Sequence, residues 1–139
     1  VNKTGDKERS KEIFQQALEE AESMLEEEGN AGILALIKIA RAVGETGDRK
    51  FVKKILQQSA DAAGKITYDF QKTEVFNQIA EAAAKTGDLQ WSKELFQQSV
   101  AAAEKLHVSL LKSRALIKNA AGILKIGETQ WAKEICPGV

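Results

Sequence analysis

The 139-residue chain has little of what breaks helices or builds chemical sites, because it contains one proline, one cysteine and one histidine. A lone cysteine cannot form a disulfide within the chain, which favours a reducing compartment. The uncharged runs are far shorter than the roughly 20 residues that span a bilayer, and no signal-peptide pattern opens the chain. We therefore expect a soluble, cytoplasmic protein that makes no membrane contact.

The chain also has no excess charge of either sign, since its 20 acidic and 20 basic residues give a formal net charge of zero. This balance argues against the uniformly positive surface of a general nucleic-acid binder. The charges are nevertheless unevenly spread along the chain. Residues 1–30 hold four basic and nine acidic residues, a net of −5, whereas residues 46–125 hold thirteen basic and eight acidic residues, a net of +5. We expect an acidic end and a basic end.

A short motif recurs along the chain: TGD at 4–6, 46–48 and 86–88, and IGE at 126–128. Its glycines, Gly5, Gly47, Gly87 and Gly127, are 42, 40 and 40 residues apart, a period typical of helical repeats. Glycine ends a helix in the left-handed conformation, and a following Asp caps the next helix. We predict helix junctions at all four glycines, with Thr129 as the cap in the last copy, within a single repeat domain over 1–139. The chain starts inside a repeat, so we expect it to be a segment of a longer repeat protein.

Helical periodicity flanks these junctions on both sides. One amphipathic helix is expected after each glycine, and a second one before it, at 33–45, 72–85 and 112–126. The links EEEGN, GKITYD and KLHVS contain the polar and glycine residues that separate helices. The sequence therefore predicts an all-α chain of about seven helices, the last one short and stopped by Pro137.

Small and large apolar residues recur at fixed distances from the glycines. After the glycine they are Ser10, Phe14 and Ala17; Val52, Leu56 and Ser59; Ser92, Phe96 and Ser99; and Ala132 and Cys136. Before it they are Leu36 and Ala40; Phe76 and Ala80; and Leu116 and Ala120. This pattern resembles the tetratricopeptide-like repeats, in a long variant of 40–42 residues where that family has about 34. The usual proline of the second helix is absent. The resemblance implies a right-handed α–α superhelix, or solenoid, of antiparallel helical hairpins.

In that family the first helix of each hairpin lines a concave groove that binds peptides. A stripe with spacings of four, three and four lies on one face of such a helix. Here it reads Leu34, Lys38, Arg41 and Glu45; Glu74, Gln78, Glu81 and Lys85; and Arg114, Lys118, Ala121 and Lys125. The resemblance implies a partner-binding site made by Lys38, Arg41, Gln78, Glu81, Arg114 and Lys118.

Some family members hold the terminal carboxylate of a peptide on this stripe. Arg114 and Lys118 match the basic pair of such clamps, but Ile37 and Arg41 stand where the remaining Lys and Asn are expected. The full clamp is therefore absent. The expected partner is a protein or peptide that is acidic or has a free C-terminal carboxylate. The alternative is that the stripe is only a solvated face.

A second recurring phrase has two adjacent glutamines, in EIFQQA at 12–17, KILQQS at 54–59 and ELFQQS at 94–99. Glutamine is a good helix former, so the simpler interpretation is a pair of rim positions that hydrogen-bond between neighbouring repeats. The alternative is a ladder of amides that reads a ligand.

Residues suited to catalysis or metal binding are scarce. His107 lies in a predicted link with no second histidine, and we interpret it as an exposed link residue. Cys136 takes the place of a core residue in a terminal helix. Asn119 stands where other copies have Ile39 and Ile79, so it is either a satisfied buried amide in a loosely packed last repeat or an amide that lines a pocket. We expect no enzyme, no cofactor and no metal site.

Two functions therefore compete. The first is a non-enzymatic scaffold for protein–protein interaction, with the stripe as its groove. The alternative is a structural module that self-associates end to end, because Phe51, Trp91 and Trp131 follow three of the glycines by four positions and Trp131 is expected to leave apolar surface exposed. The acidic and basic ends also favour such stacking.

Overall fold

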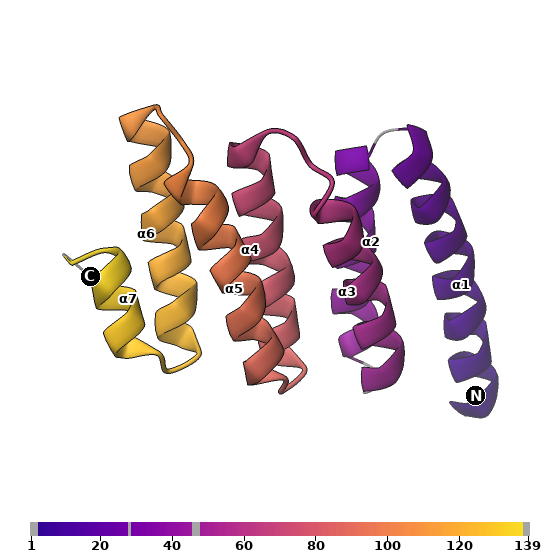
Figure 1. Ribbon diagram of the computed structural model, residues 1–139. Helices are drawn as coiled ribbons and strands as arrows, with labels where there is room; N and C mark the ends of the chain where they lie inside the picture. The colour runs from indigo at the N-terminus through magenta and orange to yellow at the C-terminus, as the bar shows by residue number, and fades with distance from the viewer. Residues whose placement is uncertain (1–2, 28, 46–47, 138–139) are drawn as a thin grey trace.

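Seven helices make up the described part of the chain in the computed structural model, which covers residues 3–27, 29–45 and 48–137, with side chains described from residue 8 onward (Figure 1). They are α1 (Lys3–Glu27), α2 (Gly29–Gly44), α3 (Arg49–Ala63), α4 (Asp69–Lys85), α5 (Leu89–Glu104), α6 (Ser109–Lys125) and α7 (Thr129–Ile135). No strand occurs in these ranges, which confirms the all-α prediction. None of the described helices combines the length and the apolar character needed to cross a membrane.

The helices form two layers. Each helix contacts the next one along the chain, and in addition α2 contacts α4 and α4 contacts α6. We refer to α2, α4 and α6 as the even layer and to α1, α3, α5 and α7 as the odd layer. In Figure 1, α3 and α5 lie in front of the even layer, and the two ends of the chain lie at opposite ends of the array.

Glycine and aspartate build the junctions between an even-layer helix and the next odd-layer helix, as predicted for the later copies. Gly87 and Gly127 have φ values of +93° and +86°, in the left-handed region that ends a helix without steric cost. Asp48 accepts a hydrogen bond from the backbone N–H of Phe51 at 3.1 Å, and Asp88 accepts one from Trp91 at 3.1 Å. Local chemistry alone therefore sets the starts of α3 and α5.

The glycines of the first two copies do not give the same evidence of a helix junction. Gly5 lies inside α1, so the predicted junction there is wrong; glycine is tolerated in a helix at a cost of about 1 kcal/mol, and α1 runs through it. Gly47 lies outside the described residues.

The cap predicted at Thr129 is also wrong, because Thr129 is the first residue of α7 and the cap position is Glu128. Glu128 makes no side-chain capping bond; its Oε1 pairs instead with Nζ of Lys93 at 3.4 Å. The acidic residue keeps the same position in both junctions, since Asp88 and Glu128 each directly follow the junction glycine. The longer Glu side chain reaches the neighbouring helix rather than its own backbone.

The helices of the even layer begin earlier than predicted, at Gly29, Asp69 and Ser109 rather than at residues 33, 72 and 112. The first three residues of each are partly buried or exposed, so they lie outside the buried apolar stripe of the helix. In the predicted link EEEGN, Glu26 and Glu27 belong to α1 and Gly29 and Asn30 belong to α2, and residue 28 lies outside the described residues. The predicted helix ends agree with the structure to within one residue.

The recurring apolar positions form the core. The fully buried members are Val52, Leu56, Ser59, Ser92, Phe96, Ser99, Ala132, Leu36, Ala40, Phe76, Ala80 and Ala120. Leu116 and Cys136 are partly buried against this core. In the first copy Phe14 and Ala17 are only partly buried and Ser10 is exposed. The difference follows from the packing of α1, which contacts α2 at one end of the array.

Candidate functional site

The six stripe residues predicted from the sequence lie on the three helices of the even layer. Lys38, Arg41, Arg114 and Lys118 are exposed on α2 and α6, whereas Gln78 and Glu81 on the central helix α4 are partly buried. The fold therefore brings all six onto one layer.

Two hollows open along this layer between neighbouring helices. The first, of about 420 Å³, lies between α2, α4 and the start of α3, and Ala40, Val52 and Ala82 line its apolar part. Its charged side chains are Arg41, Glu45, Arg49 and Lys85. Three bases against one acid give this hollow a positive rim, which favours an anionic ligand.

The second hollow, of about 280 Å³, lies between α4, α5 and α6. Phe96, Gly122 and Ile126 line its apolar part, and its charged side chains are Glu81, Lys85 and Lys125. Lys85 lines both hollows, so they are neighbours. Of the six predicted site residues, Arg41 and Glu81 line a hollow; Lys38, Gln78, Arg114 and Lys118 do not line these two.

Sequence reasoning missed Arg49 and Phe96. Both belong to the odd layer, and a stripe rule for even-layer helices cannot find them. One available signal was the position of Arg49 directly after a junction, where the start of a helix adjoins the end of its neighbour. The even layer is therefore the candidate site, with its two positive hollows and the shared Lys85.

A close packing between Gly122 and Phe96 forms the floor of the second hollow. A Cβ atom at Gly122 would lie 2.6 Å from Cζ and 2.7 Å from Cε1 of Phe96. Forty residues earlier the equivalent positions hold Leu56 and Ala82, both buried. A larger residue in α5 is therefore matched by a smaller one in α6.

Gly122→Ala is expected to lower the free energy of unfolding by about 2 kcal/mol, because the added methyl group clashes with the fully buried ring of Phe96. Phe96→Leu in the same chain should recover much of this loss, since it recreates the Leu56 and Ala82 pair. Urea denaturation of both single variants and the double variant measures the coupling. If the double variant lost as much stability as the two single variants together, the result would contradict this packing.

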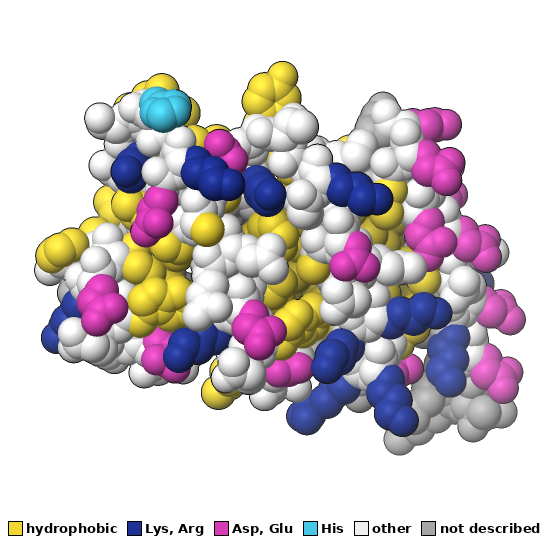
Figure 2. Space-filling model, in the orientation of Figure 1, with side chains coloured by type: hydrophobic (Ala, Val, Ile, Leu, Met, Phe, Trp, Pro, Cys, Tyr) yellow, Lys and Arg dark blue, Asp and Glu magenta, His cyan; other side chains and the backbone are white. Residues whose placement is uncertain are grey.

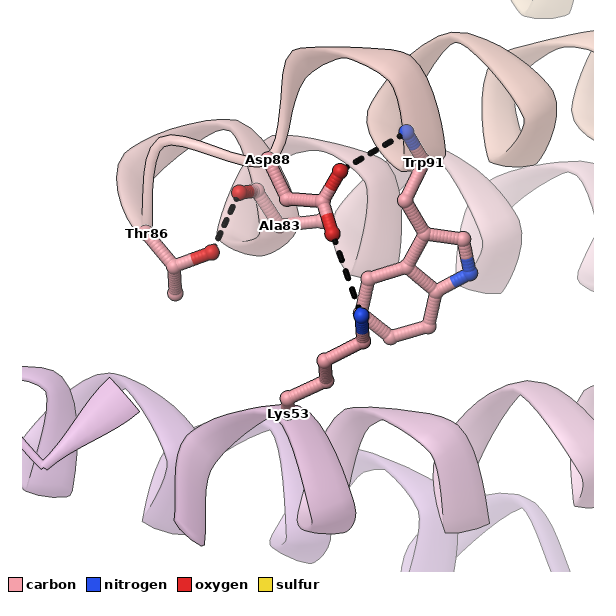
Figure 3. Close-up of polar contacts among 5 residues, drawn as sticks. All are labelled: Lys53, Ala83, Thr86, Asp88 and Trp91. Carbon is pink, nitrogen blue, oxygen red and sulfur yellow. Dashed lines mark hydrogen bonds and ion pairs between the residues drawn. The ribbon is translucent and has the colours of Figure 1, made fainter. Parts of the chain in front are cut away.

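A cluster at the junction between α4 and α5 ties the odd layer together (Figure 3). Lys53 Nζ lies 3.4 Å from Asp88 Oδ2 and 5.7 Å from the centroid of the Trp91 ring. The Thr86 hydroxyl donates to the carbonyl of Ala83 at 2.7 Å. The ion pair between Lys93 and Glu128 repeats the contact 40 residues later. Exposed pairs of this kind add little stability. Both join the start of one odd-layer helix to the odd-layer helix before it.

The recurring glutamines lie at the surface of the odd layer. Gln57 is exposed and donates to Asp61 Oδ1 in its own helix at 3.0 Å, and Gln97 and Gln98 are exposed. Gln58 Nε2 lies 3.5 Å from Glu22 Oε1 of α1, in the neighbouring repeat. Gln58 makes the contact between neighbouring repeats that the simpler interpretation predicts, but its side chain is partly buried.

The remaining candidates for chemistry are dispersed. His107 is exposed in the link between α5 and α6, and Cys136 is a free, partly buried thiol. Within the described residues, no three His, Cys, Asp or Glu side chains come together in a way that could hold a metal ion.

Asn119 is buried, with 1% of its surface exposed, and it is satisfied. Its Oδ1 accepts from Asn77 Nδ2 at 2.9 Å and from Ser99 Oγ at 2.7 Å, and its Nδ2 donates to Thr73 Oγ1 at 3.1 Å. The interpretation of a satisfied amide is therefore correct. Its location is not loosely packed, because α4, α5 and α6 all contribute to the cluster.

Comparison of the chain with protein-family models, with curated proteins and with solved structures found no match. The resemblance to the tetratricopeptide-like repeats therefore stands on the recurring residues of this sequence.

Proposed function

We propose that the protein is a non-enzymatic scaffold that binds an acidic segment of a partner protein on its even layer. In this proposal the helices form a right-handed, tetratricopeptide-like solenoid of antiparallel hairpins. The contacts of α4 with α2 and α6 support this arrangement, because helices on the inner side of a curved two-layer array lie closest together. The even layer is then the concave side.

The observation that carries the proposal is the pair of positive hollows. Arg41, Arg49, Lys85 and Lys125 outnumber Glu45 and Glu81 around floors of apolar side chains. A carboxylate at the rim with an apolar side chain beneath it fits this combination of charge and shape. Either an acidic side chain or a terminal carboxylate supplies the anion.

Binding to an array of acidic peptides, half of them with a free C-terminal carboxylate, tests this function. Arg41→Glu/Lys85→Glu reverses two charges at the hollows and is expected to weaken binding about a hundredfold, at roughly 1.4 kcal/mol for each contact. Fluorescence polarisation with the best peptide of the array measures the change.

Two further double variants locate the site. Lys50→Glu/Lys54→Glu makes the same charge change on exposed side chains of α3, in the odd layer, and should leave affinity nearly unchanged. Arg114→Glu/Lys118→Glu tests the basic pair suggested by the sequence. Equal losses in all three variants would refute a localised site and indicate only a response to net charge.

A specific observation favours a second function, end-to-end self-association. Ile117 of α6 is 53% exposed, whereas its equivalents Ile37 and Asn77 are 1% and 0% exposed. Leu110 on the same helix is 61% exposed, and Ile13 of α1, at the other end of the array, is 56% exposed. Trp131, by contrast, is partly buried against the core and does not supply the apolar surface predicted for it.

The partner in this second function is another copy of the chain. Arg114 and Lys118 lie beside Ile117 on α6, and residues 8–27 of α1, at the opposite end of the array, hold two basic and seven acidic residues, a net of −5. A contact between α6 of one copy and α1 of the next therefore joins apolar side chains and opposite charges.

The Ile117→Lys variant is expected to remain monomeric where the unchanged chain gains mass with concentration at low salt. Multi-angle light scattering over a concentration and salt series measures this. Leu34→Lys introduces the same charge at an exposed residue of α2, away from either end, and should behave like the unchanged chain. A constant monomer mass of the unchanged chain would exclude the assembly function.

A further inference from the structure

A third hollow, larger than the two described above, lies away from them. It has a volume of about 820 Å³ and opens between α1, the start of α2, the end of α3 and the link that leads into α4. Leu25, Ile33 and Ile66 contribute apolar surface, and Ile33 is buried. None of the residues of the predicted stripe lines it.

Carboxylates dominate the rim of this hollow. Glu22 and Glu26 come from α1 and Asp61 from α3, against one lining base, Lys65. The surrounding α1 region is acidic as well, and Figure 2 shows the Asp and Glu side chains gathered along the α1 end of the molecule. The rim and its surroundings therefore attract a cationic group.

A buried acceptor within the hollow lacks a donor. Gln58 Nε2 has a long contact of 3.5 Å with Glu22 Oε1, and Gln58 Oε1 is buried with no hydrogen-bond partner among the described residues. A buried carbonyl oxygen without a donor carries a substantial desolvation penalty. This oxygen is closed to solvent, so the Gln58 side chain has to turn before an N–H donor of a ligand reaches it and removes that penalty.

Tyr68 stands at the edge of the same hollow with 73% of its surface exposed. Tyrosine offers an apolar ring and a hydroxyl, and its ring face attracts Lys and Arg cations. The hollow thus combines an apolar floor, acidic side chains, an unpaired acceptor and an exposed aromatic ring.

We propose that this acidic hollow binds a basic segment of a second partner protein. An apolar side chain of the segment packs on Leu25, Ile33 and Ile66, and flanking Lys or Arg side chains lie beside Glu22, Glu26 and Asp61. The charge is opposite to that of the even-layer hollows. The protein would then hold an acidic partner and a basic partner at the same time, on different surfaces.

An acetylated and amidated peptide KRWKR is a direct probe, titrated into isotope-labelled protein and followed by NMR. We expect chemical-shift changes at the Gln58 side-chain amide and at the backbone amides of Leu25 and Ile66. The peptide KRSKR keeps the charge but lacks the apolar anchor, and it should bind about tenfold more weakly. Shift changes centred elsewhere, or equal affinity of the two peptides, would overturn the proposal.

Charge-neutral variants separate this site from general attraction. Glu22→Gln/Glu26→Gln/Asp61→Asn is expected to weaken KRWKR binding about tenfold. The control Glu94→Gln/Glu104→Gln/Glu134→Gln removes as many exposed carboxylates from α5 and α7 and should leave affinity within about twofold. Equal losses in both variants would overturn the site.

Two additional measurements keep the test decisive. Thermal melting shows whether the triple variant is folded, and Asp61→Asn alone replaces it if it is not, with a loss of about twofold to threefold expected. Binding of acidic peptides to the even layer should be unchanged in these variants. Failure of the basic site is thereby distinguishable from failure of the proposed scaffold function.

Discussion

Gly32→Ala is expected to lower the free energy of unfolding by about 3 kcal/mol and to loosen α1 from the rest of the molecule. A Cβ atom at this position would lie 2.6 Å from the backbone N and 2.8 Å from Cα of Leu25, and 2.9 Å from the carbonyl carbon of Met24. These are backbone atoms of α1, so no side-chain rotation relieves the clash. The cost belongs at the upper end of the range for overpacking.

Gly29→Ala is the matched control, because it makes the same change in the same helix with no atom within 4 Å of the added Cβ. It should leave stability unchanged or raise it slightly, as alanine is the better helix former. Urea denaturation gives the difference between the two variants, and hydrogen exchange shows whether the loss is confined to α1. Equal stability of both variants would mean that the backbones of α1 and α2 do not approach so closely.

Gly32→Ala should also affect the acidic hollow. Glu22, Leu25 and Glu26 reach the hollow from α1, and their position depends on the contact of that helix with α2. Loosening α1 should therefore weaken KRWKR binding while leaving the even-layer hollows intact. A global loss of structure would weaken both activities together.

Junction chemistry was the part of the fold that the sequence predicted best. A glycine with positive φ and an aspartate that accepts from the third following residue act within a few residues, so Gly87 and Asp88 can be recognised locally. Glu128 shows the limit of this reasoning, because its ion pair with Lys93 of another helix decides where its carboxylate lies. The starts of α2, α4 and α6 were missed because their first three residues lie outside the buried apolar stripe.

The candidate site was predictable only in outline. Helical spacing places Lys38, Gln78 and Lys118 on one layer, because that relation depends on geometry within each helix. The hollows depend instead on Arg49 and Phe96, which come from the other layer. The acidic hollow needs α1 and α3 to be side by side, and the only sequence signal was the local excess of acidic residues before residue 30.

A buried polar cluster between α4, α5 and α6 supports the second large prediction. Thr73 donates to the carbonyl of Ser99 at 2.8 Å, Ser99 donates to Asn119, and Asn119 donates back to Thr73. Asn77 adds a bond to Asn119 Oδ1, and all four residues are at most 1% exposed. Asn119 is thus the member on which the other three converge.

Asn119→Ile alone is expected to lower the free energy of unfolding by about 2–4 kcal/mol. The change removes one hydrogen bond from each of Asn77, Ser99 and Thr73 in a site closed to water. The three side chains keep their bonds to the carbonyls of Lys118, Thr73 and Ser99, respectively, so the loss is that of the three bonds to Asn119. Urea denaturation followed by circular dichroism measures the loss. A loss below about 1 kcal/mol would indicate that the cluster is open to water.

The repeat itself supplies the compensating variant. Forty residues before Thr73, Asn77 and Asn119 stand Ile33, Ile37 and Ile79, all buried, and the equivalent of Ser99 is the buried Ser59. Ser59 donates to the carbonyl of Ile55 in its own helix at 3.0 Å, so Ser99 has the same option with Leu95. Thr73→Ile/Asn77→Ile/Asn119→Ile should therefore be at least as stable as the unchanged chain, because replacing a whole buried polar group costs far less than breaking it.

The contrast between the single and the triple variant isolates the role of the polar cluster. If stability returns while the NMR spectrum of the triple variant loses dispersion, the hydrogen bonds fix the register of α6 against α4 and α5. If stability returns with an unchanged spectrum, apolar packing of the kind seen around Ile33 is sufficient for that register. Losses that add across the three substitutions would contradict the equivalence of the two repeats, on which the compensation depends.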